Sequence, residues 1–552
     1  MPPLDLPDVQ PAGDLRRRME LNFRRLHDPE FHFDAMRVCS TAREAPGDWI
    51  GRALLGLTLH AHALDREAPH RLEILDRLPE ALNSRGYIGT VLPTGCVDEN
   101  QIGGHNALLC GLAAVFQLDH DERALTLGRT IIRELFLPIE PLIAAYPDQP
   151  PPSLSDGSQV GLTVRQSGVW CGLSTDIGIA FFTLDALTRW QTIDPDPALD
   201  HLIETMARRY EQIDPVAIGA QTHGTLSTLR GLLRWRPHRN REHWLQLVRA
   251  RHQAYLNLGR TEHHGNLNWF GRPAWTEACA IVDSFILALE LWSETGDPSY
   301  LDEAHRVFHN ALAYAQRPNG GYGCDCCVGA NGSPFLEPHE FYEAPWCCTM
   351  RGAEGLAETA RWNVTVSENR IDWLLHLSGR FRIPLGVGDA LVEVDSKFPK
   401  QAEVNWKVIA STVDRPVTSR IFLPEGVEPG VLRINGQTVS PDRNDNRFLS
   451  FTAPLRTGDH WEWLGTCVFR QLPALHPEQW PSTVRYAHGP LLLGCEAPSG
   501  AAAAGRPDEW HLQQNDWYRS TADNRRLSPL NSVSFLPAAE ARHHRTRLLF
   551  QQ

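Results

Sequence analysis

Two adjacent cysteines, Cys347 and Cys348, are the residues of this sequence that bear most directly on chemistry. Neighbouring thiols do not easily close a disulfide with each other, but both can bind a metal ion. Glu277 and Cys279 lie upstream of this pair. One carboxylate and three thiolates make a four-coordinate shell of a kind that zinc accepts. The sequence therefore predicts a Zn²⁺ site formed by Glu277, Cys279, Cys347 and Cys348.

The spacing of these ligands predicts that they lie at the starts of helices. Glu277 and Cys279 are two positions apart, so they cannot share one face of a regular helix, where neighbours are three or four apart. We expect an apolar helix from about residue 280 and another over 352–361, just after the cysteine pair. Because a helix N-terminus favours negative charge, two helix starts could converge on one metal ion.

Other interpretations of the thiols stay open at this point. Cys279 could be a core thiol and the adjacent pair a chance of packing. A second group, Cys324, Cys326 and Cys327, follows the glycine-rich run 320–323. We interpret it as a loop with incidental thiols, and a second metal site or a share in the first is the alternative.

Histidines recur beside glycines in polar contexts near expected helix starts. They are His105, His223, His263 and His264. Taken singly, each is typical of a capping or buried histidine. In a ring of helices, several of them at the same end would line a concave pocket and could hydrogen-bond a polyol.

The distribution of apolar residues predicts two kinds of architecture along the 552 residues. From about residue 15 to 362 the helical period dominates, with amphipathic helices expected over 199–210 and 301–315 after Asp-Pro turns. Beyond 362, alternation over 404–412 and 418–423 predicts an antiparallel β-sandwich. The prediction is a toroid of α/α hairpins over 1–362, with a helical solenoid as the alternative. A β-sandwich over 363–470 and further sandwich strands over 471–552 follow it.

Charge and hydropathy exclude several classes of partner. The formal net charge is -13 and no basic block occurs, which argues against nucleic acid and against an anionic membrane surface. No stretch approaches the roughly twenty apolar residues of a membrane span. The first residues lack a basic region followed by an apolar run, so we expect a cytoplasmic protein whose clustered cysteines bind metal.

Four short motifs resemble those of glycoside hydrolase family 127, the β-L-arabinofuranosidase group. They are Thr-Glu-Ala-Cys-Ala at 276–280, the pair Cys347-Cys348, Gly-His at 104–105 and the apolar strand 488–496. The resemblance covers most of the chain. It implies an α/α six-hairpin barrel followed by β-sandwich domains, and a carbohydrate substrate.

The same resemblance implies roles for individual residues. It makes Cys347 a metal-bound nucleophile, with Glu277, Cys279 and Cys348 as the other zinc ligands. Asn266 stands where the family has its acid/base glutamate, so the nearby Glu262 is assigned that role. His305 replaces a family glutamate near the sugar hydroxyls, and it joins His105, His223 and His264 as a predicted substrate contact.

We therefore predict a zinc-dependent retaining glycosidase that acts on a furanoside or a related unusual sugar. One alternative is a carbohydrate-binding or structural protein with a structural zinc ion. Another is a lyase or isomerase on the same barrel, with His223, His263 or His264 as base. A homodimer is left open.

Overall fold

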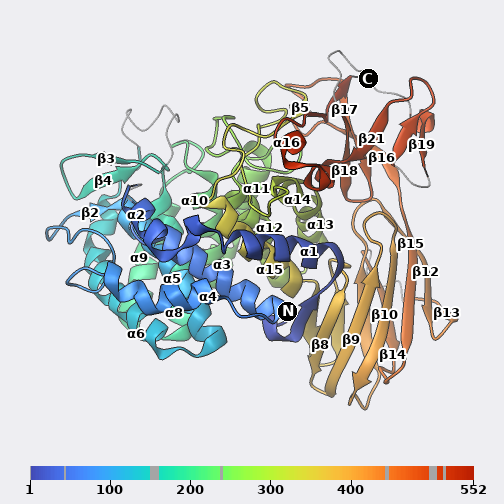
Figure 1. Ribbon diagram of the computed structural model, residues 1–552, viewed down its shortest axis with the longest axis horizontal. Coiled ribbons are helices and arrows are strands. Elements are labelled where there is room, and N and C mark those ends of the chain that lie inside the picture. The colour runs from blue at the N-terminus through green and yellow to red at the C-terminus, as the bar shows by residue number, and fades with distance from the viewer. Residues whose placement is uncertain are drawn as a thin grey trace.

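The computed structural model describes residues 2–42, 45–149, 161–235, 240–441, 447–496, 507–513 and 517–551. Helices fill the first part of the chain and strands the last part, and the two parts lie side by side (Figure 1). The last helix of the first part ends at Arg361, and the first strand after it begins at Val364. No helix within these ranges combines the length and the apolar character needed to cross a membrane.

Six largely buried helices form the centre of the helical part. They are α3 (Asp48–Leu64), α5 (Glu99–Asp119), α8 (Leu184–Ile193), α10 (Thr222–Arg234), α12 (Ala278–Thr295) and α15 (Cys348–Arg361). Each of them packs against the next, and α15 packs against α3, so their contacts close into a ring. The contacts of an open helical solenoid would not close in this way, because its first and last repeats do not meet.

A second set of helices packs outside this ring. Each ring helix contacts one of them: α15 contacts α1 (Gly13–Arg25), α3 contacts α4 (Pro69–Arg77), α5 contacts α6 (Glu122–Ile131), α8 contacts α9 (Pro197–Glu211), α10 contacts α11 (Arg241–Leu258) and α12 contacts α13 (Pro298–Arg306). These outer helices bury one face only, as amphipathic sequences do. Shorter helices complete the part: α2 (Phe33–Ala42), α7 (Ile179–Phe182) and α14 (Ala313–Ala315).

The predicted amphipathic helices are present, and their starts follow from the sequence. Asp196 accepts a hydrogen bond from the amide of Ala198 and so caps α9, whose first residue is a proline. Asp297 caps α13 in the same way. The predicted segment 301–315 is not one uniform helix, because α13 continues through a π-helical turn, Val307–Leu312, into α14.

Two sheets pack face to face after the helical part. The larger has the strand order β1-β8-β9-β10-β15-β12-β13 and the smaller has β14-β11-β7-β6. Their strands are β1 (Val9–Pro11), β6 (Val364–Ser367), β7 (Arg370–Trp373), β8 (Gly379–Leu385), β9 (Gly388–Ser396), β10 (Glu403–Ser411), β11 (Val417–Phe422), β12 (Val427–Ile434), β13 (Gln437–Val439), β14 (Phe448–Ala453) and β15 (His460–Cys467). The ring of Trp373 meets that of Trp406 across the interface, with centroids 5.6 Å apart. Pairing is antiparallel except between β7 and β11.

A third sheet lies at the C-terminal end (Figure 1). It contains β16 (Phe469–Pro473), β17 (Thr483–His488), β18 (Leu491–Glu496), β19 (Trp510–Leu512), β20 (Tyr518–Ser520), β21 (Arg526–Pro529), β22 (Thr546–Arg547), β23 (Phe550–Gln551) and β5 (Phe335–Leu336). A small sheet of β2 (Val97–Asp98), β4 (Trp170–Ser174) and β3 (Thr163–Arg165) lies in the helical part. Because β1 and β5 come from before residue 362, the helical part contributes strands to two of the later sheets.

Candidate metal centre and active site

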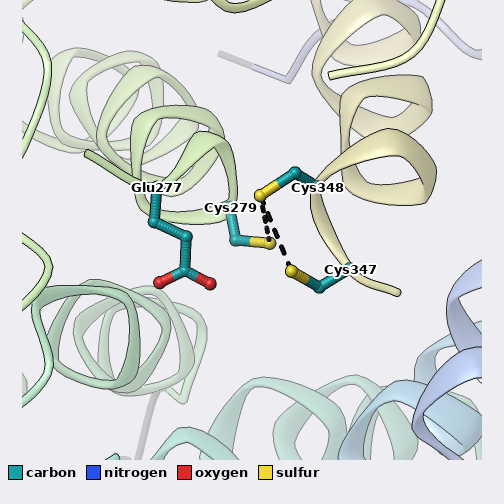
Figure 2. Close-up of side chains that lie close together, drawn as sticks. All are labelled: Glu277, Cys279, Cys347 and Cys348. Atoms are coloured by element: carbon teal, nitrogen blue, oxygen red, sulfur yellow. Dashed lines mark hydrogen bonds between the residues drawn. The ribbon is translucent and has the colours of Figure 1, made fainter. Parts of the chain in front are cut away.

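Glu277, Cys279, Cys347 and Cys348 come together in one cluster. Each offers a ligand atom, and these atoms all lie within 4.8 Å of one another (Figure 2). The sulfur of Cys348 is 4.0 Å from that of Cys279 and 3.6 Å from that of Cys347. Two thiolates on one tetrahedral zinc ion, with Zn–S bonds of about 2.3 Å, lie about 3.8 Å apart. The donor set and the sulfur spacing therefore both fit zinc.

Two helix starts carry the four side chains. Glu277 is the N-cap of α12 and Cys279 is the second residue of that helix. Cys347 is the N-cap of α15 and Cys348 is its first residue. The two helices pack against each other in the ring, so their N-termini meet. The partial positive charge of both N-termini favours the ionised forms that a metal requires.

Three amide side chains hold Glu277. The backbone amide of Glu277 donates to Oδ1 of Asn266 at 2.9 Å. The amide of Asn268, oriented so that both of its ends are satisfied, donates to Glu277 Oε2 at 2.6 Å. Gln221 donates to the same oxygen at 3.3 Å. Asn266, which stands at the acid/base position of the resemblance, thus positions a predicted metal ligand.

His223 links the cluster to a buried group of charges. Its Nδ1 lies 3.9 Å from Glu277 Oε1, and its Nε2 lies 3.3 Å from Asp283 Oδ2. Asp283 is fully buried, and it also pairs with Arg230 and Arg351. These two arginines hold the pKa of Asp283 well below its usual range despite its burial. An ionised Asp283 fixes the orientation of the His223 ring.

Arg52 approaches the cluster from α3, which the sequence analysis did not connect with the site. Its Nη1 is 3.6 Å from the sulfur of Cys279, and its Nε donates to Asp48 at 2.8 Å. Arg52 also lines a small cavity beside the cluster, together with Asn106, His223 and Arg351. This cavity adjoins the centre of the helix ring, because its lining comes from α3, α5, α10 and α15.

Glu262, the predicted acid/base, is held by the C-terminal sheet. Its two carboxylate oxygens accept hydrogen bonds from the backbone amides of Leu475 at 2.8 Å and His476 at 3.0 Å. Arg485 lies 3.2 Å from the same carboxylate. The side chain is fully buried. These bonds tie the loop after α11 to the segment between β16 and β17.

Of the four predicted sugar-binding histidines, the structure brings His223 to the cluster. His105 uses both ring nitrogens on the backbone, accepting from Ile88 and donating to Gln101, and burial lowers its pKa to about 4. His264 lies 3.5 Å from Glu303. His305 donates to the carbonyl of Leu374 at 2.9 Å and packs on the rings of His309 and Phe422. Contacts of these three histidines with a sugar stay predictions.

The second thiol group is split among three environments. Cys326 donates to the carbonyl of Phe335 at 3.1 Å and accepts from the amide of Glu337. Cys327 contacts the carbonyl of Asn266 at 3.8 Å. Cys324 is buried, and its segment is bonded to residues next to the cluster, because the amide of Asp325 donates to Thr276 Oγ1 at 2.9 Å and the amide of Tyr322 donates to Thr349 Oγ1 at 3.1 Å. One of the three thiols therefore adjoins the candidate metal centre.

Asp176 is a carboxyl near the cluster that the sequence analysis missed. It follows β4, and its Oδ1 is buried without a hydrogen-bond partner in the described part of the chain. Burial and the charge of Glu277 raise the pKa of Asp176 well above its usual value. Such a group stays protonated more readily than an exposed aspartate. No metal-type spacing or glycine context marks Asp176 in the sequence, so only the structure identifies it.

Solved structures decide which fold this is. A GH127 β-arabinofuranosidase matches with a TM-score of 0.71 at 12% identity, covering 100% of this chain and 97% of the other. The chain shares the fold of this structure. A second GH127 β-L-arabinofuranosidase, from Geobacillus stearothermophilus T6, matches with a TM-score of 0.68 at 12% identity, over 98% of this chain and 99% of the other.

A third structure, described as a glycoside hydrolase, matches with a TM-score of 0.68 at 11% identity, over 100% of this chain and 97% of its own. No protein-family model matches the sequence, and no curated protein matches it. The resemblance seen in the motifs is therefore supported over the whole chain by its fold.

Proposed function

We propose that the chain is a zinc-dependent retaining glycoside hydrolase related in activity to the β-L-arabinofuranosidases, and that its closed helix ring is the six-hairpin barrel implied by the resemblance. The observation that carries this proposal is the cluster of one carboxylate and three sulfurs at the meeting of two ring helices. Two of the similar structures are β-arabinofuranosidases, which supports the substrate class.

The four clustered residues would hold the metal. When bound, zinc keeps its sulfur ligands as thiolates at neutral pH, which is the reactive form of cysteine. Glu277 would be held in place by Asn268 and Gln221 through their hydrogen bonds to its carboxylate. Cys347 is the one cluster cysteine that is not fully buried, which favours it over Cys279 and Cys348 as the nucleophile.

Cys347 would act as the nucleophile of a double displacement. In the first step its sulfur forms a bond to the anomeric carbon, the bond from that carbon to the leaving oxygen breaks, and a carboxylic acid protonates that oxygen. In the second step the same group, now a carboxylate, takes a proton from water. The water oxygen bonds to the anomeric carbon, and the sulfur leaves as a thiolate. The anomeric configuration is retained.

Two buried carboxyls are candidates for the acid/base. Glu262 is the group expected from the sequence, but both of its oxygens already accept backbone hydrogen bonds. Asp176 has an unpartnered oxygen and a raised pKa, and it interacts electrostatically with the metal ligand Glu277. A general acid must be protonated at the working pH and must reach the leaving group. The unpartnered oxygen and the raised pKa favour Asp176.

Leaving-group dependence distinguishes the two carboxyls. We expect Asp176→Asn to lose about 10²- to 10⁴-fold in turnover of aryl glycosides with poor leaving groups, and much less with good ones, because a good leaving group needs no proton. Glu262→Gln then affects both kinds of substrate alike. The opposite pattern would assign the role to Glu262.

Covalent trapping tests the function itself. The zinc-loaded protein is incubated with aryl furanosides, quenched in acid and mapped by mass spectrometry. The proposal predicts a glycosyl adduct on Cys347 and a product of retained configuration. Sugar binding without an adduct or a product would indicate a binding protein with a structural metal. Product without incorporated water would indicate a lyase or isomerase.

A further inference from the structure

Two histidines and a glutamate form a second group of metal-type ligands, in addition to the cysteine cluster. Within the part of the chain that the structure describes, His32, His70 and Glu73 each offer a ligand atom, and these atoms lie within 4.8 Å of one another. The proposed glycosidase chemistry makes no use of them. Imidazole nitrogen and carboxylate oxygen together suit zinc and similar transition metals, whereas calcium and magnesium prefer oxygen ligands alone.

Helix geometry brings these three side chains together. His70 and Glu73 are three positions apart on α4, so they lie on the same face of that helix. His32 follows the 3₁₀ turn Pro29–Phe31 and directly precedes α2, which packs against α4. Nδ1 of His32 lies 4.0 Å from Oε2 of Glu73, and the ring centroids of His32 and His70 are 4.2 Å apart.

The ring of His70 is held in the tautomer that a metal ligand needs. Its Nδ1 lies 3.4 Å from the carbonyl oxygen of Leu26. A carbonyl oxygen can only accept, so the neutral ring carries its proton on Nδ1 and keeps the lone pair of Nε2 for a metal ion. Histidine ligands usually donate their other ring nitrogen in this way. The ring of His27 stacks on that of His70, with centroids 4.7 Å apart, and limits its rotation.

Glu73 keeps one carboxylate oxygen for the ion. Its Oε1 lies 3.4 Å from Nη1 of Arg77, whereas its Oε2 faces His32. Arg77 also pairs with Asp34 at 2.8 Å and with Glu80 at 3.0 Å. Because these two carboxylates balance the charge of the guanidinium, Arg77 does not make the group repel a cation.

A small movement would close the three ligands on one ion. Ligand atoms about 2.0–2.1 Å from a tetrahedral zinc ion lie about 3.4 Å apart, so the present separations, which reach up to 4.8 Å, must shorten by about 1 Å. The side chains of His32 and Glu73 are 48% and 29% exposed, which leaves them room to rotate. Three protein ligands leave the fourth position of the ion for water.

This group lies far from the cysteine cluster. Arg52, which contacts Cys279, is near the start of α3, whereas α4 follows the end of that helix. The 12 residues from Arg52 to Leu64, the last residue of α3, span about 18 Å at about 1.5 Å per residue. An ion bound by His32, His70 and Glu73 therefore takes no part in the proposed reaction.

We propose that His32, His70 and Glu73 bind a second zinc ion, which joins the segment before α2 to α4 on the outside of the helix ring and stabilises their contact. The inference goes beyond the proposed function and does not depend on it. This site has one ligand fewer than the cysteine cluster and is more exposed, so it releases its ion more readily. Dialysed protein should keep the ion of the cysteine cluster, and the second ion should bind when zinc is added.

Zinc titration of dialysed protein tests the site. Calorimetry should show one more ion bound per chain in the wild type than in His32→Ala. Glu73→Gln should weaken this binding step at least as much as loss of a residue that orients a ligand, about 10- to 100-fold. Added zinc should raise the Tm of the wild type but not that of His32→Ala, because an ion that binds the folded state stabilises it. Turnover should be unchanged in both variants.

A matched variant separates this site from adventitious binding by surface histidines. His243→Ala removes another exposed histidine that pairs with a glutamate, Glu211 at 2.7 Å, and should bind zinc as the wild type does. Anomalous diffraction at the zinc absorption edge should place the added ion between His32, His70 and Glu73.

Two results would overturn the inference. One is a titration that is the same in the wild type and in His32→Ala, and the other is no binding of added zinc beyond the cysteine cluster. Dialysed protein that holds no zinc, but in which added zinc binds in a step that His32→Ala abolishes, would contradict the proposed metal centre alone and would support the second site.

Discussion

The two thiol-bearing segments of this protein differ in what their cysteine side chains contact. Cys347 and Cys348 place their sulfurs 3.6 Å apart beside Cys279. Cys326 and Cys327, which are equally adjacent in sequence, turn to the carbonyls of Phe335 and Asn266. Adjacency therefore does not make a metal site. The difference lies in the backbone that carries each pair.

A helix start gathers ligands, whereas an extended segment disperses them. Cys347 is an N-cap with φ of -152° and ψ of -62°, which is not a helical conformation. Its side chain is therefore not held at the angular spacing that separates consecutive residues within a helix, and it can lie beside that of Cys348. The segment after Tyr322 forms isolated antiparallel bridges, such as that between Asp325 and Pro338. Successive side chains of extended backbone point to opposite sides.

Loss of the nucleophile should have the largest effect. We expect Cys347→Ala to lower turnover by roughly 10⁴- to 10⁶-fold, because no other group can form the covalent intermediate. Cys327→Ala, from the dispersed segment, should keep turnover near the wild-type value. Initial rates on an aryl furanoside, with metal content measured in parallel, make the comparison. Similar losses in both variants would remove the distinction between the segments.

Loss of a hydrogen bond to the carboxylate ligand should have a smaller effect than loss of the nucleophile. Asn268→Ala removes a donor to Glu277 Oε2, and we expect zinc affinity to fall about 10- to 100-fold, the range typical of residues that orient a ligand. Competition with a chromophoric chelator measures the affinity. Asn257→Ala, an exposed amide on α11, is the control that should change nothing. An unchanged affinity for Asn268→Ala would mean that Glu277 does not bind the metal.

The smallest effect is expected at Cys326. Its sulfur accepts from the Glu337 amide and donates to the Phe335 carbonyl, so Cys326→Ala removes both of these hydrogen bonds. We expect a loss of about 1–2 kcal/mol in the free energy of unfolding and no change in zinc affinity. Urea denaturation of the metal-free and metal-loaded forms measures both. Weaker zinc binding would show that this segment does contribute to the centre.

The sequence predicted the four-residue cluster because the signals that mark its members are local. Glu277 and Cys279 are two positions apart, Cys347 and Cys348 are adjacent, and both motifs precede apolar helices. Spacing and helix signals were therefore enough to propose these four residues as ligands, and the structure places their ligand atoms within 4.8 Å of one another. The succession of helices and strands was predictable for the same reason, since it depends on periodicity within short windows.

The rest of the site depends on contacts between distant segments. Arg52 and Asp176 carry no motif, and only the packing of the ring brings them to the cluster. His105 shows the reverse case, because its glycine-rich context is typical of a site although backbone groups occupy both of its ring nitrogens. Local sequence cannot separate these situations.

Metal analysis of purified variants tests the central claim most directly. Elemental mass spectrometry should find one zinc ion per chain in the wild type, one in Cys326→Ser and little or none in Cys279→Ser, with folding of each checked by circular dichroism. A wild-type protein without zinc, or a folded Cys279→Ser variant that keeps its full zinc content, would contradict the account.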